Sequence, residues 1–235
     1  MRVSRQALVL VAAMLLARSH AEDGAPARLA PAYDARKVAG WRVHGNRDLL
    51  GAQAELGARA LALMETKLTE LRPLLPLAAL TKLERAPIWL GVDDHDKPNA
   101  VYHPSAEWLR AHGWMPEKAG AVEVPSAAVF IAWAEQQPMI LLHELAHAYH
   151  HQVLGHEHAE LRAAFKRART DGRYDAVRHV SGKTQRAYAL NNGEEFFAEM
   201  SEAYFGRNDF FPFTREELRA HDAETFALIE KLWCP

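Results

Sequence analysis

Residues 139–151 read MILLHELAHAYHH, and this stretch decides how the rest of the chain is interpreted. The apolar run 139–142 leads directly into His143, so we expect a helix that enters the core. Residues four apart lie on one face of a helix, and the imidazoles of His143 and His147 can therefore reach one ion. A glutamate beside the first histidine is placed to take a proton from water. The stretch thus predicts a zinc site with Glu144 as the general base.

A catalytic zinc needs a third protein ligand, and the same helix does not supply it. A longer zinc motif requires a glycine three residues after the second histidine and another histidine three residues later. Those positions hold His150 and Val153 here. His151 shares a face with His147 but lies two turns, about 12 Å, from His143, which is too far for one ion. We therefore interpret His151 as a surface residue or a neighbour of the ligands.

The third ligand is expected from a second helix, in the segment NGEEFFAEMSEAYF at 192–205. Glu195 and Glu199 are four residues apart and share a face among aromatic side chains. Buried carboxylates are costly without partners, and a metal for one and an imidazole for the other would offset that cost. We predict Glu195 as the ligand and Glu199 as the residue that orients a ligating histidine. Glu194 competes for the ligand role, and Glu202 competes for the orienting role.

The motif HELAH, followed by the glutamate of EFFAE 48 residues after His147, resembles the gluzincin group of zinc peptidases. More narrowly, it is similar to the catalytic domain of anthrax lethal factor and to the clostridial Pro-Pro endopeptidases. Members of that family place a tyrosine seven residues before the glutamate ligand, and this sequence has Tyr188 seven residues before Glu195. The resemblance covers roughly residues 85–235. It implies that the Tyr188 hydroxyl faces the metal and assists the reaction.

The resemblance also implies an α+β fold of the zincin type. A small mixed sheet packs on helices, its edge strand lies beside the active-site helix, and the C-terminal half is helical. The segment 121–132, rich in residues that favour strands, is our candidate for the edge strand, to which a peptide substrate would pair. Pro125 in its middle favours either an edge strand or a break between two short strands. We assign 46–235 to one metallopeptidase domain, preceded by a poorly ordered lead-in at 22–45. The sequence leaves open whether this lead-in is a propeptide.

Hydrophobic periodicity and breaking residues predict the remaining elements. A short apolar strand is expected at 87–92. The expected helices are 49–75, 136–154, 157–169, 194–204 and 215–233.

The first 21 residues have the features of a cleaved signal peptide. Arg2 and Arg5 precede the apolar run 7–17, which is too short to span a bilayer comfortably. Small residues at the positions that a signal peptidase inspects predict cleavage near Ala21. We therefore expect a secreted or periplasmic protein with no stable membrane insertion after cleavage, and an uncleaved membrane anchor is the alternative.

Composition narrows the class of protein further. The 28 basic and 30 acidic residues nearly balance, so no nucleic-acid partner is expected. Cys234 is the only cysteine, which excludes an internal disulfide and a structural zinc site built from cysteines. We predict a monomeric endopeptidase that binds one Zn²⁺ per chain and hydrolyses protein or peptide substrates. The alternatives are a catalytically weak binding or adhesion module with the same fold and a hydrolase of a non-peptide amide.

Overall fold

A computed structural model describes residues 32–92 and 99–234. The predicted signal peptide at 1–21 and residues 22–31 of the lead-in lie outside the described residues. The fold is α+β, with a small mixed sheet and many helices, as the sequence predicted. Within the described residues, no helix has both the length and the apolar character needed to cross a membrane.

The larger sheet has five strands in the order β1-β2-β3-β5-β4. β1 and β2 form an antiparallel hairpin, whereas β2, β3 and β5 run parallel to one another. β4 pairs antiparallel with β5 and forms the edge of the sheet. The strands are β1 (Tyr33–Val38), β2 (Trp41–Asn46), β3 (Ile88–Leu90), β4 (Val101–Tyr102) and β5 (Val122–Val124).

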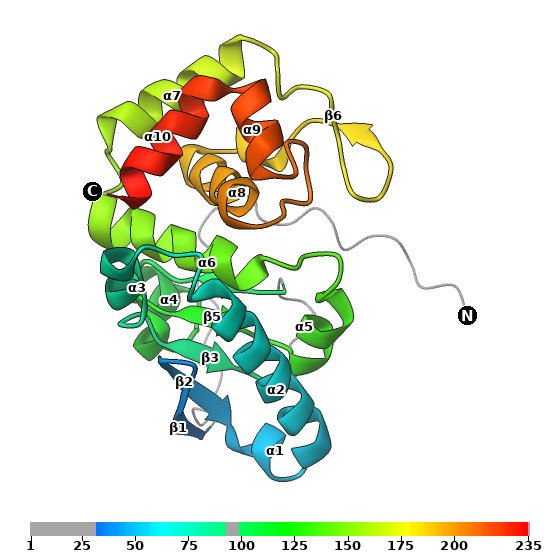
Figure 1. Cartoon of the computed structure of the whole chain (residues 1–235). Coiled ribbons are helices and arrows are strands. Elements are labelled where there is room, and N and C mark those ends of the chain that lie inside the picture. Colours follow the sequence, from blue (N-terminus) through cyan, green and yellow to red (C-terminus); the bar gives the residue numbers. More distant parts are fainter. Residues whose placement is uncertain (1–31, 93–98, 235) are drawn as a thin grey trace, which may run out of the picture.

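The helices lie on both sides of one central helix, α6. Figure 1 shows α6 across the middle of the molecule, with the sheet and α2 below it and the C-terminal helices above it. The helices are α1 (Arg47–Leu50), α2 (Ala54–Leu71), α3 (Leu77–Leu83), α4 (Ala106–Ala111), α5 (Ala127–Trp133), α6 (Ile140–Tyr149), α7 (Ala159–Thr170), α8 (Gly193–Phe205), α9 (Arg215–His221) and α10 (Ala223–Trp233). A short hairpin, β6 (Val177–Arg178) and β7 (Thr184–Gln185), forms the second sheet.

The expectation of a poorly ordered lead-in is wrong for residues 33–45, which form most of the β1–β2 hairpin. Trp41 and Val43 of this hairpin are fully buried. The turn was missed because Ala39 and Gly40 both have positive φ angles, 45° and 106°. Two-residue turns of this kind usually carry Asn-Gly or Asp-Gly, and Ala-Gly does not give that signal.

The expectation of an edge strand at 121–132 is also wrong. The strand β5 ends at Val124, and α5 begins at Ala127. Pro125 lies at the break, and the Ser126 side chain accepts a hydrogen bond from the Val129 backbone N–H (3.3 Å), which caps α5. Because β5 lies between β3 and β4, the edge beside α6 belongs to β4.

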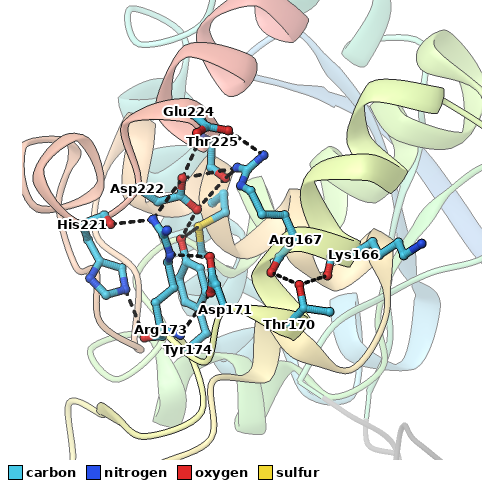
Figure 2. Close-up of polar contacts among 11 residues, drawn as sticks. Lys166, Arg167, Thr170, Asp171, Arg173, Tyr174, His221, Asp222, Glu224 and Thr225 are labelled. Carbon is cyan, nitrogen blue, oxygen red and sulfur yellow. Dashed lines mark hydrogen bonds and ion pairs between the residues drawn. The ribbon is translucent and has the colours of Figure 1, made fainter.

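The predicted helix at 215–233 is divided into α9 and α10 at Asp222. The Asp222 carboxylate accepts hydrogen bonds from the Thr225 backbone N–H (3.0 Å) and from the Thr225 hydroxyl (2.7 Å), so it caps α10. Figure 2 shows the same carboxylate between Arg167 and Arg173, with the Tyr174 hydroxyl 3.2 Å away. These contacts join α7, the loop after it and α10.

Candidate metal centre

The helices α6 and α8 bring the three predicted ligands together. Nε2 of His143 lies 3.0 Å from Oε2 of Glu195, and Nε2 of His147 lies 3.4 Å from the same oxygen. In a tetrahedral zinc site with bonds of about 2.1 Å, neighbouring ligand atoms are about 3.4 Å apart. Two imidazole nitrogens and one carboxylate oxygen therefore surround a space that fits one small ion, and this donor set is typical of zinc.

Local structure fixes the ligand glutamate at the start of α8. The Asn192 side chain accepts a hydrogen bond from the Glu195 backbone N–H at 2.7 Å and caps the helix. Glu195 is 7% exposed, whereas the side chain of its competitor Glu194 is 42% exposed and lies 3.7 Å from His156. Of the two candidates for the third ligand, only Glu195 faces the two histidines.

Two of the candidate ligands, His143 and Glu195, carry opposite charges. Burial alone would lower the pKa of His143, but hydrogen bonds to Glu195 and Glu202 outweigh it and raise that pKa well above its usual value. Burial would raise the pKa of Glu195, but hydrogen bonds from His143 and His147 lower it. A metal ion must displace the proton on His143, so metal binding at this site releases a proton.

The residue that orients His143 is Glu202, not Glu199 as expected. Oε1 of Glu202 lies 2.6 Å from Nδ1 of His143, the ring nitrogen that faces away from Glu195. Such a carboxylate fixes the tautomer and the orientation of a ligating histidine. Glu195, Glu199 and Glu202 occupy positions i, i+4 and i+7 of one helix face, and the way α6 crosses α8 brings Glu202 to the ring.

Glu199 lies next to this contact but is not part of it. Its side chain is 3% exposed, and its Oε2 has no hydrogen-bond partner among the described residues. Burial, followed by the charges of Asp209 and Glu202, raises the pKa of Glu199 well above its usual value. A neutral carboxyl group is therefore favoured at this position.

The predicted general base, Glu144, points toward the sheet edge. Its Oε2 accepts a hydrogen bond from the Tyr102 backbone N–H at 2.7 Å, and Tyr102 is the last residue of β4. The Tyr102 hydroxyl lies 2.7 Å from Nδ1 of His151 and accepts a hydrogen bond from Nε2 of Gln152 at 3.0 Å. Tyr102 therefore joins the edge strand both to the base and to the end of the helix that carries the ligands. His151 is thus a neighbour of the site rather than a ligand.

The structure also brings Tyr188 to the site. Its hydroxyl donates a hydrogen bond to Oε1 of Glu195 at 3.4 Å. Burial, together with the negative charge of Glu195, raises the pKa of the Tyr188 phenol. The phenol therefore keeps its proton at neutral pH and remains a hydrogen-bond donor.

Tyr102 was not expected at this site, and Glu202 was expected only as an alternative to Glu199. Tyr102 carries no local signal, because its role depends on the packing of β4 against α6, 42 residues further along the chain. Comparison of the chain with known protein families, with curated proteins and with solved structures found no match.

Proposed function

We propose that this chain is a zinc-dependent endopeptidase with a zincin-like domain. The observation that carries the proposal is the convergence of His143, His147 and Glu195 on a space that fits one ion. The Tyr188 hydroxyl contacts Glu195, and Glu144 is the neighbour of His143 on α6, which adds a hydrogen-bond donor and a base to the three candidate ligands. A metal site with a purely structural role would need neither group.

In the proposed reaction, a zinc ion held by His143, His147 and Glu195 would supply Lewis acidity to the peptide carbonyl. Glu144 accepts a proton from the attacking water and passes it to the leaving amine. The Tyr188 hydroxyl donates a hydrogen bond to the carbonyl oxygen as that oxygen gains negative charge.

We propose that the substrate is an extended peptide that pairs with β4. Among the described residues β4 pairs with β5 alone. The Tyr102 backbone N–H donates to Glu144, so a peptide that pairs with the free side of β4 would compete with Glu144 for that group. Because Tyr102, the last residue of β4, already contacts Glu144, a peptide along β4 would place its backbone near the base. Pairing through main-chain hydrogen bonds provides affinity for a peptide but does not select its side chains, so no preferred cleavage sequence follows from it.

The competing functions are a binding or adhesion module and a hydrolase of a non-peptide amide. The first would have no use for Glu144, which follows His143 on α6 and holds its carboxylate against the Tyr102 backbone N–H. The second would not use an open strand edge. In line with the sequence at 1–21, we also propose export, cleavage near Ala21 and a monomeric mature protein without a stable membrane anchor.

Metal analysis combined with a peptide-library cleavage assay tests this function. We expect zinc in the purified chain, cleavage of peptides by the wild type and no cleavage by Glu144→Gln, which keeps the size of the side chain and all three ligands. Full zinc content in Glu144→Gln serves as the control for folding. If the wild type bound zinc but cleaved no peptide in a broad library, the binding module would be the better reading. If Glu195→Ala retained its zinc at His143 and His147 with unchanged affinity, the proposed ligand set would be wrong.

A further inference from the structure

Four histidines lie close together where α6 ends and the chain turns toward α7. Two of them make hydrogen bonds. His151 pairs with the Tyr102 hydroxyl, and Nδ1 of His158 accepts a hydrogen bond from the first turn of α7. The other two, His150 and His156, take no part in the proposed catalytic site. His150 begins a π-helical turn, His150–Leu154, a feature that is frequent at functional sites.

His150 is buried without a polar partner. It is 2% exposed and packs against the Phe197 ring at a centroid distance of 5.6 Å. Neither of its ring nitrogens has a hydrogen-bond partner among the described residues. A buried polar group without a partner is costly, so such a group calls for an explanation.

Two groups near His150 that could provide a partner belong to His156 and Glu194. The His150 and His156 rings lie 5.9 Å apart between centroids. Nδ1 of His156 lies 3.7 Å from Oε1 of Glu194. If the bonds to a tetrahedral zinc ion are about 2.1 Å long, two ligand atoms lie about 3.4 Å apart. The ring centroids of two imidazoles on that ion then lie about 5 to 6 Å apart. Both measured distances are close to these values, but the ligand atoms of the three residues do not yet all lie within 4.8 Å of one another, so His156 and Glu194 would have to rotate toward His150 to hold an ion.

The protonation state of His150 and the exposure of His156 and Glu194 also suit a metal. Burial lowers the pKa of His150 to about 4, and the negative charge of Glu194 offsets part of this effect. The imidazole is therefore neutral at neutral pH, as a metal ligand must be. The side chains of His156 and Glu194 are 48% and 42% exposed, so they can rotate toward an ion that His150 holds from the buried side.

We propose that His150, His156 and Glu194 form a second site for a divalent transition metal such as Zn²⁺. The site lies beyond His147 along the same helix and is open to solvent on the side of His156. It is separate from the catalytic ligands and does not depend on peptidase activity. Its ligands are two nitrogens and one oxygen, which suits zinc, nickel and copper better than calcium or magnesium.

The test is the number of zinc ions bound at equilibrium with excess free Zn²⁺, measured on the full chain. We expect His156→Ala and Glu194→Ala each to bind one ion fewer than the wild type. His112→Ala should bind as many ions as the wild type, because His112 is an exposed histidine on a different element, stacked on Trp108. Thermal unfolding in chelator should be the same for His156→Ala and the wild type, since the side chain is half-exposed.

The count also separates this proposal from the catalytic one. In a His147→Ala background, which lacks a catalytic ligand, the ion lost in His156→Ala should still be present. An equal zinc count in the wild type and in His156→Ala would overturn the second site, whatever the total. A count that drops only when His147 is changed would overturn it as well. Loss of one ion in His156→Ala but none in His147→Ala would support the second site and contradict the catalytic ligand set.

Discussion

The most direct test of the site's architecture compares Glu202→Gln with Glu199→Gln. Oε1 of Glu202 lies 2.6 Å from Nδ1 of His143, whereas Oε2 of Glu199 has no partner among the described residues. Glutamine keeps the size of either side chain and is always neutral. Burial raises the pKa of Glu202 to about 7, so above that pH its hydrogen bond with His143 is charge-assisted, and glutamine replaces it with a neutral one that is about half as strong.

The size of the expected effect follows from this geometry. Loss of a partner behind a ligating histidine typically lowers metal affinity by 10 to 100-fold. Because glutamine still accepts a hydrogen bond, we expect the lower end for Glu202→Gln, about tenfold or 1.4 kcal/mol. For Glu199→Gln we expect a change of less than about threefold, because burial and the charges of Asp209 and Glu202 already favour the neutral carboxyl.

Zinc affinity can be measured for both variants by competition with a chelator of known affinity. Thermal unfolding of the metal-free proteins provides the control, because a general loss of stability would appear there as well. The reasoning would be refuted if Glu199→Gln weakened zinc binding as much as Glu202→Gln or more. In that case the sequence-based assignment of Glu199 as the orienting residue would be restored.

Three further predictions concern single residues. Tyr188→Phe should lower turnover by roughly tenfold to a thousandfold with little change in KM or zinc content, and an unchanged turnover number would remove the oxyanion role. Asp222→Ala should lower the free energy of unfolding, measured by denaturant titration, by about 3 kcal/mol. The substitution removes a helix cap and leaves Arg167 and Arg173 without the carboxylate that they share. Asp222→Asn can still cap the helix and should lose less stability in the same titration. Burial holds the pKa of His150 near 4, below the usual 6.5, so the unfolded chain binds a proton that the folded chain does not. The metal-free protein should therefore lose stability as the pH falls from about 6.5 to about 4, and His150→Leu should show a smaller loss over that range.

The residues that could be predicted from the sequence are those whose relations are fixed by one helix. His143, Glu144 and His147 lie within two turns of α6, so their spacing alone determines that the ligands share a face. The capping of α10 also has a local signal, because Asp222 is followed three residues later by Thr225, whose N–H it accepts. The apolar periodicity of 215–233 continues across Asp222 and favoured one long helix over this local signal.

Other features depend on how separate elements meet. Glu199 and Glu202 lie on the same face of α8, and no property of that helix alone decides which one reaches His143. β4 forms the edge of the sheet because β5 pairs with a strand on each side. This edge could not be predicted, because β4 is only two residues long and has little sequence pattern of its own. Likewise, the β1–β2 hairpin could not be predicted from its turn, because Ala39 has a positive φ angle that alanine rarely adopts.

The contact between His143 and Glu195 links two points of the chain that are 52 residues apart. An ion bound by both residues would act as a cross-link that closes a loop of that size. Unlike a disulfide, the ion would be released when the site unfolds, so it would stabilise the folded state by mass action, by about 2.7 kcal/mol when free zinc is 100 times its Kd. The single cysteine, Cys234, cannot provide such a link within the chain. A bound metal would then also protect the chain against unfolding and proteolysis. Removal of the metal by a chelator would make the protein more susceptible to degradation, whether or not it is turning over substrate.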